Sequence, residues 1–269
     1  MDFTYPEIKK LYDQTYETFK SIPQVAKIAI YGSAINKNFD RYSDLDVEVQ
    51  LSDWDLMSSQ IESTFKKVGS PFVIFPAIND PGNGVMTVLW KDYPFYQKLD
   101  MRLLSLTNPL SKESQIVYEG KKVKEKKANK TIKLSFEESY RPFYDLFIGA
   151  TRFAKHRKRN EHLSAYKFYR SGWESLMRLY FFDIKLGKYT ANNLTIEDLK
   201  KVDREDKYLA EMFIDYISTT HKKLDENYVN LLERYFNESI LRGLIKKSSK
   251  EEDFGQNVIK FVRNELIGA

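Results

Sequence analysis

The stretch Val25-Ala26-Lys27-Ile28-Ala29-Ile30-Tyr31-Gly32-Ser33, followed after ten residues by Asp44-Leu45-Asp46-Val47-Glu48-Val49, decides the expected fold. Its first part is an apolar run of strand composition that ends at a Gly-Ser pair. The absence of a Cβ at Gly32 would let a phosphate approach the backbone, and Ser33 could cap a helical turn whose unpaired N–H groups favour an anion. The stretch therefore predicts a strand that leads into a phosphate-binding loop.

Residues 44–51 alternate between polar and apolar side chains, as a half-buried strand does. The acidic side chains share one face of that strand, opposite the core: Asp44, Asp46 and Glu48. Two carboxylates about 5 Å apart repel each other by about 3 kcal/mol at an effective dielectric constant of about 20. Asp44 and Asp46 therefore predict a site for a hard divalent cation, and Mg²⁺ is the best candidate. We expect Glu48, in contrast, to face solvent at a strand edge.

A third carboxylate, Asp100, lies in the alternating apolar segment 96–104. In two-metal phosphoryl transfer, such a residue holds the second ion beside the attacking hydroxyl or accepts its proton. The polar connection 36–43 also contains Arg41, which is a candidate for binding the nucleotide.

The combination of Gly32-Ser33, Asp44-x-Asp46 and Asp100 resembles the active-site signature of the DNA polymerase beta-like nucleotidyltransferase superfamily. The resemblance covers roughly residues 1–120. It implies an Mg²⁺-dependent, adenylyltransferase-like enzyme that takes an NTP, expected to be ATP, as co-substrate. The implied catalytic and metal-binding residues are Asp44, Asp46 and Asp100, and the implied nucleotide-binding residues are Gly32, Ser33 and Arg41. The chain length, the segment 114–120 and a long helical second half are similar to the bacterial antibiotic nucleotidyltransferases that modify aminoglycosides and lincosamides.

Composition narrows the class of protein further. The chain has 269 residues, 42% of them hydrophobic and 14% aromatic, which is ample for a packed core. The chain has no cysteine and only three scattered histidines, which excludes disulfides, zinc ribbons and thiol catalysis. The first residues lack the pattern of a secretion signal, and no apolar run is long enough to span a bilayer. We therefore expect a soluble cytoplasmic protein without a membrane partner.

The predicted fold class is α+β, with a mixed-sheet catalytic domain at residues 1–120 and a C-terminal helical bundle domain at residues 134–269. The basic run 121–133 is expected to be an exposed connection between them. Helices are predicted at 7–20, 53–67, 140–153, 164–185, 197–201, 207–221, 228–247 and 253–266, and strands at 25–31, 44–51, 72–75, 85–90 and 96–104. The Ser135/Glu138 spacing predicts a capping box before the first helix of the bundle. A sheet packed against such a bundle would form a cleft for the second substrate.

Charge separates the hypotheses about that substrate. Residues 1–120 hold 12 Lys/Arg against 16 Asp/Glu, whereas residues 121–269 hold 31 against 22. A small hydroxyl-bearing acceptor is favoured; a cationic aminoglycoside would need carboxylates, and the candidates are Glu137, Glu138, Asp145 and Glu174. The basic runs leave RNA open as a less favoured acceptor. Alternatively, Arg152, Lys155 or Arg157 of these runs could contact the triphosphate.

Two alternatives therefore remain beside transfer to a small molecule. One is a nucleotidyltransferase that acts on RNA or protein, which no recognisable RNA-binding motif supports. The other is a toxin-antitoxin type of regulatory module, because Arg157-x4-His162 matches the short Arg/His motif of helical ribonucleases that accompany nucleotidyltransferases.

Overall fold

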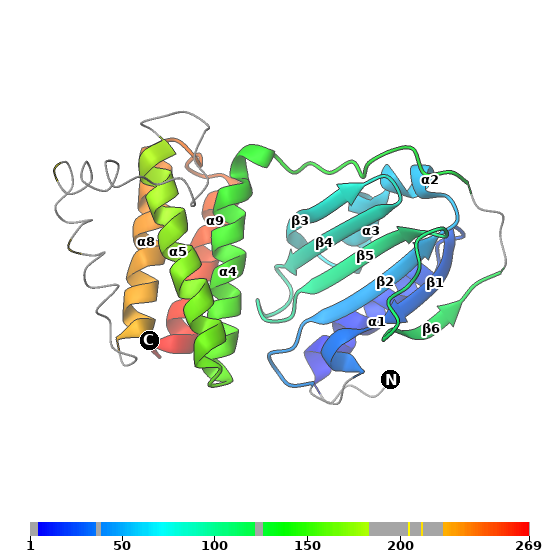
Figure 1. Ribbon diagram of the computed structural model, residues 1–269, viewed down its shortest axis with the longest axis horizontal. Coiled ribbons are helices and arrows are strands. Elements are labelled where there is room, and N and C mark those ends of the chain that lie inside the picture. The colour runs from blue at the N-terminus through cyan, green and yellow to red at the C-terminus, as the bar shows by residue number, and fades with distance from the viewer. Residues whose placement is uncertain are drawn as a thin grey trace. The chain divides into compact units, whose positions relative to one another are not determined.

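The structure is a computed structural model that describes residues 5–35, 39–121, 126–182, 204, 211 and 223–268. It divides into two compact units, Met1–Glu137 and Glu138–Ala269. The first unit contains a mixed sheet with helices, and the secondary structure described in the second unit is all helical (Figure 1). The predicted α+β class is confirmed.

The sheet of the first unit has six strands in the order β3-β4-β5-β2-β1-β6. Their bounds are β1 (Val25–Ile30), β2 (Leu45–Leu51), β3 (Pro71–Asp80), β4 (Asn83–Trp90), β5 (Leu99–Ser105) and β6 (Gln115–Glu119). Strands β2 and β5 pair in parallel, and all other neighbours are antiparallel. Strand β2 is thus an interior strand, with β1 on one side and β5 on the other.

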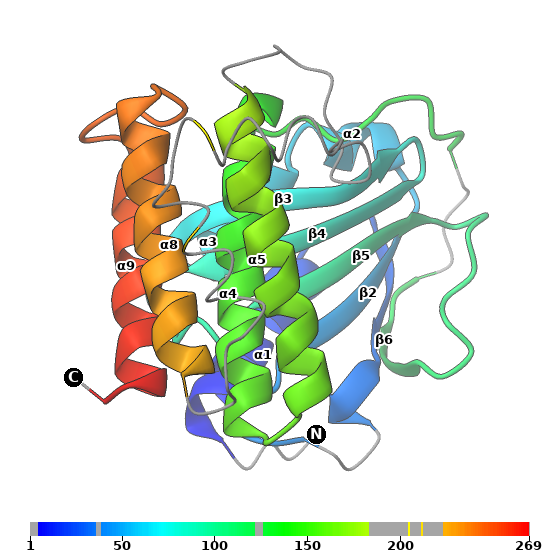
Figure 2. The ribbon, with the colours of Figure 1, turned by 60° about the vertical axis from the view of Figure 1, so that its left-hand side comes forward.

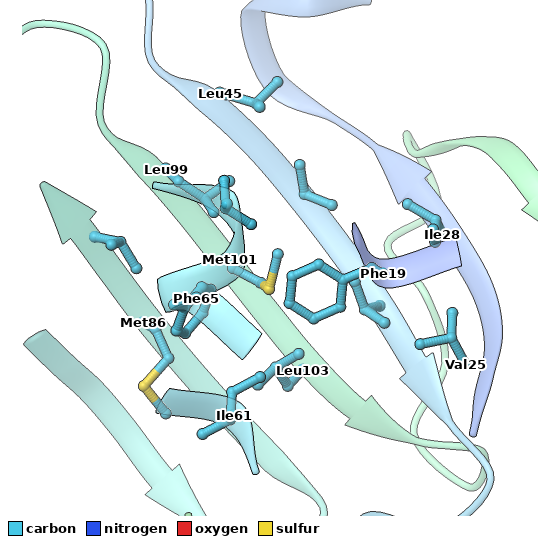
Figure 3. Packing of buried hydrophobic residues seen from close by; sticks show 14 of the residues in the cluster. Phe19, Val25, Ile28, Leu45, Ile61, Phe65, Met86, Leu99, Met101 and Leu103 are labelled. Carbon is cyan, nitrogen blue, oxygen red and sulfur yellow. The ribbon is translucent and has the colours of Figure 1, made fainter. Parts of the chain in front are cut away.

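Apolar side chains from the sheet pack against α1 (Pro6–Lys20) and α3 (Ile61–Val68) in one buried cluster (Figure 3). Phe19 of α1 and Phe65 of α3 meet in it with ring centroids 6.0 Å apart. Alternate residues of β2 enter the cluster: Leu45, Val47, Val49 and Leu51. Because successive side chains of a strand point to opposite faces, this packing directs the polar residues of β2 to the other face of the sheet.

The helix predicted at 53–67 is interrupted, and forms α2 (Trp54–Ser58) and α3. Asp53 caps α2 as expected, because its side chain accepts a hydrogen bond from Leu56 N at 3.2 Å. The hydroxyls of Ser58 and Ser59 then donate to backbone carbonyls one turn earlier, at 2.9 and 2.8 Å. Such bonds compete with helix continuation, which explains the break that apolar spacing alone did not predict.

The basic run at 121–133 is anchored to the first unit wherever the structure describes it. The indole of Trp54 donates to Lys130 O at 2.6 Å, and the side chain of Asn79 bonds both to Ile132 N and to Ile132 O, at 2.7 and 3.0 Å. Ile132 is 4% exposed and belongs to the core cluster. The first unit consequently extends to Glu137, beyond the boundary expected at residue 120. The sequence analysis missed this arrangement because Ile132 stands among many lysines.

The capping box expected at Ser135 is absent from the described structure. Ser135 N and Oγ donate instead to the carboxylate of Glu62 on α3, at 2.7 and 2.9 Å, so this serine is held by the first unit. The first long helix of the second unit, α4 (Arg141–Lys158), follows a short turn, η2 (Glu138–Tyr140). Pro142 stands in its first turn, where its missing N–H costs nothing.

The second unit is a bundle of α4, α5 (His162–Phe182), α8 (Leu224–Leu241) and α9 (Lys250–Leu266), in which α4 packs on α5 and α9, and α8 packs on the same two (Figures 1 and 2). Aromatic side chains fill its interior. Gly255 lets α9 approach closely, since a Cβ there would lie 2.7 Å from the ring of Phe236. Helix α8 ends earlier than the predicted residue 247, at a turn where Gly243 has φ +71°. The helices predicted at 197–201 and 207–221 lie outside the described residues, except for Glu211, which is helical.

Candidate active site

The Gly-Ser loop lies directly against one of the predicted carboxylates. Strand β1 ends at Ile30, and the chain then enters a single 3₁₀ turn, η1 (Gly32–Ala34). Gly32 adopts φ +68°, and a Cβ there would overlap Asp46 Oδ2 and lie 3.0 Å from Asp46 Cγ. Tyr31 N donates to Asp46 O at 3.2 Å, which fixes the loop to β2. Glycine is therefore required at position 32 both by the backbone conformation and by the carboxylate beside it.

Ser33 carries a buried hydroxyl oxygen without a hydrogen-bond partner among the described residues. A buried hydroxyl left unsatisfied costs about 1–3 kcal/mol. The helical turn expected at this position is only one 3₁₀ turn long, so little of the anion affinity expected from a helix dipole is available here. The unpartnered Ser33 hydroxyl is therefore what this loop offers a ligand, because the Asp46 carboxylate occupies the space left by the missing Cβ of Gly32.

Asp46 and Asp100 lie next to each other on adjacent strands. They are paired in register on the parallel strands β2 and β5. Asp44 precedes β2, at the point where Leu45 N donates to Lys98 O at 3.0 Å. The side chains of Asp44 and Asp100 are 19% and 20% exposed. The structure thus brings the three predicted carboxylates to one end of β2 and β5, on the face opposite the core.

The turn before Asp44 is built by Asp40. Its carbonyl accepts from Ser43 N, and its carboxylate accepts from Tyr42 N, each at 3.0 Å. Arg41, predicted to bind the nucleotide, is exposed, with its guanidinium carbon 5.0 Å from the centre of the Tyr42 ring. The described contacts of Arg41 are therefore with its neighbour in the turn, and its role toward a nucleotide stays a prediction.

Lys98 is the residue of this site that the sequence analysis missed. Its Nζ lies 2.7 Å from Asp44 Oδ2 and also contacts Asp100 Oδ2, and its side chain is 3% exposed. The other oxygen of Asp100, Oδ1, accepts a hydrogen bond from Thr87 Oγ1 at 2.6 Å. The signal was present in the sequence, because Lys98 stands two positions before Asp100 and so shares its side of the chain as it enters β5.

Tyr31 contributes a neutral hydroxyl to the same region. Burial raises the pKa of Tyr31 far above its ordinary value, and the nearby carboxylates of Asp46 and Asp100 raise this pKa further. The phenol therefore stays protonated over the physiological range and can donate a hydrogen bond.

The expectation that Glu48 faces solvent at a strand edge is wrong. Its side chain is fully buried and accepts hydrogen bonds from Ser111 N at 2.8 Å, Ser111 Oγ at 2.6 Å and Arg102 Nη1 at 3.2 Å. Strand β2 is interior, and the segment after β5 folds back to place Ser111 against this carboxylate. Arg102, whose side chain is 33% exposed, is held by Glu48 two residues beyond Asp100 on the same face of β5.

Several candidates in the second unit are already engaged in ion pairs. Glu138 pairs with Arg141 at 2.5 and 2.8 Å. Arg157 binds both oxygens of Asp225, at 2.6 and 2.8 Å, and its Nη1 lies 3.0 Å from His162 Nδ1. The two residues of the short Arg/His motif are thus adjacent, and the arginine is neutralised by an aspartate.

The other candidates of the second half gain no assigned role. Glu137, Asp145, Arg152 and Lys155 are described, and their roles toward an acceptor or a triphosphate stay predictions. The side chain of Glu174 lies outside the described residues.

The carboxylate oxygens of Asp44, Asp46 and Asp100 suit a hard cation, although they are not arranged as a complete set of metal ligands. Within the described ranges, no three Asp, Glu, His or Cys side chains are arranged to hold a metal ion. The carboxylates of Asp44 and Asp100 contact an ammonium group instead, while Asp46 lies against Gly32. Carboxylate oxygens are the ligand class that Mg²⁺ takes.

Comparisons with known proteins add little to this picture. No protein-family model matches the sequence, and no curated protein is similar to it. A search of solved structures finds the cyclic dinucleotide synthase CdnE of Elizabethkingia meningoseptica, solved with GTP and Apcpp. The match covers 96% of this chain and 90% of the CdnE chain, with 15% sequence identity and a TM-score of 0.25. A TM-score of this size establishes neither a shared fold nor a shared activity. No helix in the described part of the chain is long and apolar enough to cross a membrane.

Proposed function

We propose that this chain is an Mg²⁺-dependent nucleotidyltransferase of the DNA polymerase beta-like superfamily, which moves a nucleoside monophosphate from an NTP to a hydroxyl group of a small molecule. The observation that carries the proposal is the contact between the Gly32 loop and Asp46, with Asp100 paired to Asp46 across two strands. The Gly32 loop and the carboxylates of Asp46 and Asp100 are thereby held next to one another. The sequence signature and this geometry support the same chemistry.

In this proposal, the triphosphate lies on the Gly32-Ser33 loop, where the Ser33 hydroxyl gains the partner that it lacks among the described residues. Mg²⁺ bound by Asp44 and Asp46 would neutralise charge on the phosphate oxygens. Asp100 is directed toward the acceptor hydroxyl, and Thr87 and Lys98 hold its carboxylate in place. These residues act by positioning the reactants and by preorganised charge, which is how phosphoryl transfer is mainly catalysed.

The direct test is pyrophosphate release from each NTP in the presence of a panel of hydroxyl compounds, with aminoglycosides and lincosamides among them. Asp46→Asn and Asp100→Asn should each abolish release. Asp100→Asn should keep NTP affinity within about tenfold, because Asp44 and Asp46 remain. Asp80→Asn, in an exposed hairpin, is the matched control and should keep wild-type release. Normal turnover in Asp46→Asn would refute the proposal.

The acceptor class can be decided with salt. If RNA were the acceptor, it would be bound through contacts between its phosphates and the basic residues. Raising the salt concentration from 50 to 200 mM would weaken those contacts and lower the affinity for RNA by roughly a thousandfold or more. A small neutral acceptor would show little dependence. The described part of the basic run is bound to α2, through Lys126 Nζ to Asp53 Oδ2 at 2.6 Å and Lys130 N to Asp55 Oδ1 at 3.0 Å. We therefore expect that neutralising Lys121, Lys127 and Lys133 leaves transfer to a small hydroxyl compound unchanged.

A further inference from the structure

The ammonium group of Lys98 is the cation that the structure places among the candidate carboxylates. It contacts Asp44 Oδ2 at 2.7 Å and Asp100 Oδ2, and only 3% of the side chain is exposed. Lysine is almost never buried to this degree unless it is paired. Both of its partners are residues that the superfamily signature assigns to metal binding.

The oxygens of Asp100 are both engaged by the protein. Oδ1 accepts from Thr87 and Oδ2 accepts from Lys98, so this carboxylate is oriented by two donors. Thr87 is the register partner of Asp100 on β4, and β5 lies between β4 and β2, so the backbone pairing supports this orientation. A divalent ion between Asp44 and Asp100 would have to displace the ammonium group of Lys98, whose side chain is buried along its whole length. Asp46, in contrast, faces the Gly32 loop.

We propose that Lys98 takes the place of the second metal ion, so that the chain binds one divalent cation instead of two. Asp44 and Asp46 would hold the single ion. Lys98 supplies the positive charge on the acceptor side and positions Asp100. This inference rests on the proposed nucleotidyltransferase function, and concerns how many metal ions that site takes.

The test counts Mn²⁺ ions bound by the full chain with a non-hydrolysable NTP, using the electron paramagnetic resonance signal of free Mn²⁺. Wild type should bind one ion. Lys98→Met removes the resident charge and should either bind a second ion or bind the first at least tenfold more tightly. Lys98→Arg keeps a cation and should bind one ion, as should Lys112→Met, a control at an exposed position.

Two bound ions in wild type would overturn the inference, as would identical counts and affinities in wild type and Lys98→Met. If Lys98→Met does not fold, the counts for wild type and Lys98→Arg decide. These outcomes leave the proposed function intact. Absence of Mn²⁺ binding from wild type and from Lys98→Met alike would instead refute the proposed function, and the inference with it.

Discussion

Replacing Gly32 with alanine should separate backbone strain from displacement of a carboxylate, because a second glycine of the chain has the same strain without the neighbour. Gly32 has φ +68°, and a Cβ there would overlap Asp46 Oδ2. Gly243 has φ +71°, and a Cβ there would meet nothing within 4 Å. Gly243→Ala is therefore a matched control for Gly32→Ala.

The magnitudes follow from these two environments. A left-handed backbone costs a residue with a Cβ roughly 1–2 kcal/mol, and the smaller entropy of unfolded alanine offsets about 0.4–1 kcal/mol of this. Both variants should therefore lose about 1 kcal/mol of free energy of unfolding. Only Gly32→Ala forces the Asp46 carboxylate to move. Since displacing the supports of a metal ligand costs about 10–100-fold in affinity, we expect a loss of that size for Mn²⁺ in Gly32→Ala alone.

The assay combines urea unfolding with Mn²⁺ titration of the wild type and both variants. The expected pattern is a similar loss of stability in the two variants, and a loss of Mn²⁺ affinity in one. Wild-type Mn²⁺ affinity in Gly32→Ala would show that Asp46 does not bind the ion, or that its position does not depend on the glycine. An equal affinity loss in Gly243→Ala would show that strain acts at a distance, which also contradicts the reasoning.

Two further predictions concern the supports of the site. Glu48→Gln places an amide where three donors converge on a buried carboxylate, so the free energy of unfolding should fall by about 1–3 kcal/mol in urea titrations. The exposed Glu119→Gln should change it by less than about 0.5 kcal/mol, and an equal effect of both substitutions would contradict the role assigned to Glu48. For Glu62, burial raises the pKa, but hydrogen bonds from Ser135 and the charge of Lys66 outweigh it and hold this pKa below its ordinary value. The stability that Glu62 contributes is therefore present above its unfolded pKa of about 4.3 and is lost as pH falls through the lower folded value. The stability difference between wild type and Glu62→Gln should accordingly be largest above about pH 5 and shrink on acidification, and a difference independent of pH would contradict this.

Local patterns in the sequence were sufficient for five of the six strands and for the carboxylates, whereas β6 was not predicted. Alternation placed Asp46 and Asp100 on strands, and the Gly32-Ser33 pair marked the end of β1. These signals work because strand periodicity and the backbone freedom of glycine are properties of a few consecutive residues.

The features that the sequence analysis missed depend on contacts between distant segments. Whether Glu48 is exposed depends on β5 and Ser111, which lie more than fifty residues away. The burial of Lys98 depends on the same pairing with β2. Most described residues of the basic run are exposed as expected, but the burial of Ile132, held by Asn79, was missed because composition does not encode such contacts.

The parallel pairing of β2 with β5 sets Asp46 opposite Asp100 through backbone hydrogen bonds, and the same pairing sets Leu45 opposite Leu99 and Val47 opposite Met101. If either strand shifted by one residue, its carboxylate would enter the hydrocarbon core and its leucines would enter water. A chain with the wrong alignment would therefore fail to fold instead of folding with its carboxylates misplaced. Substitutions that weaken the packing between these strands should lower the amount of folded protein, while the molecules that do fold keep Asp46 opposite Asp100.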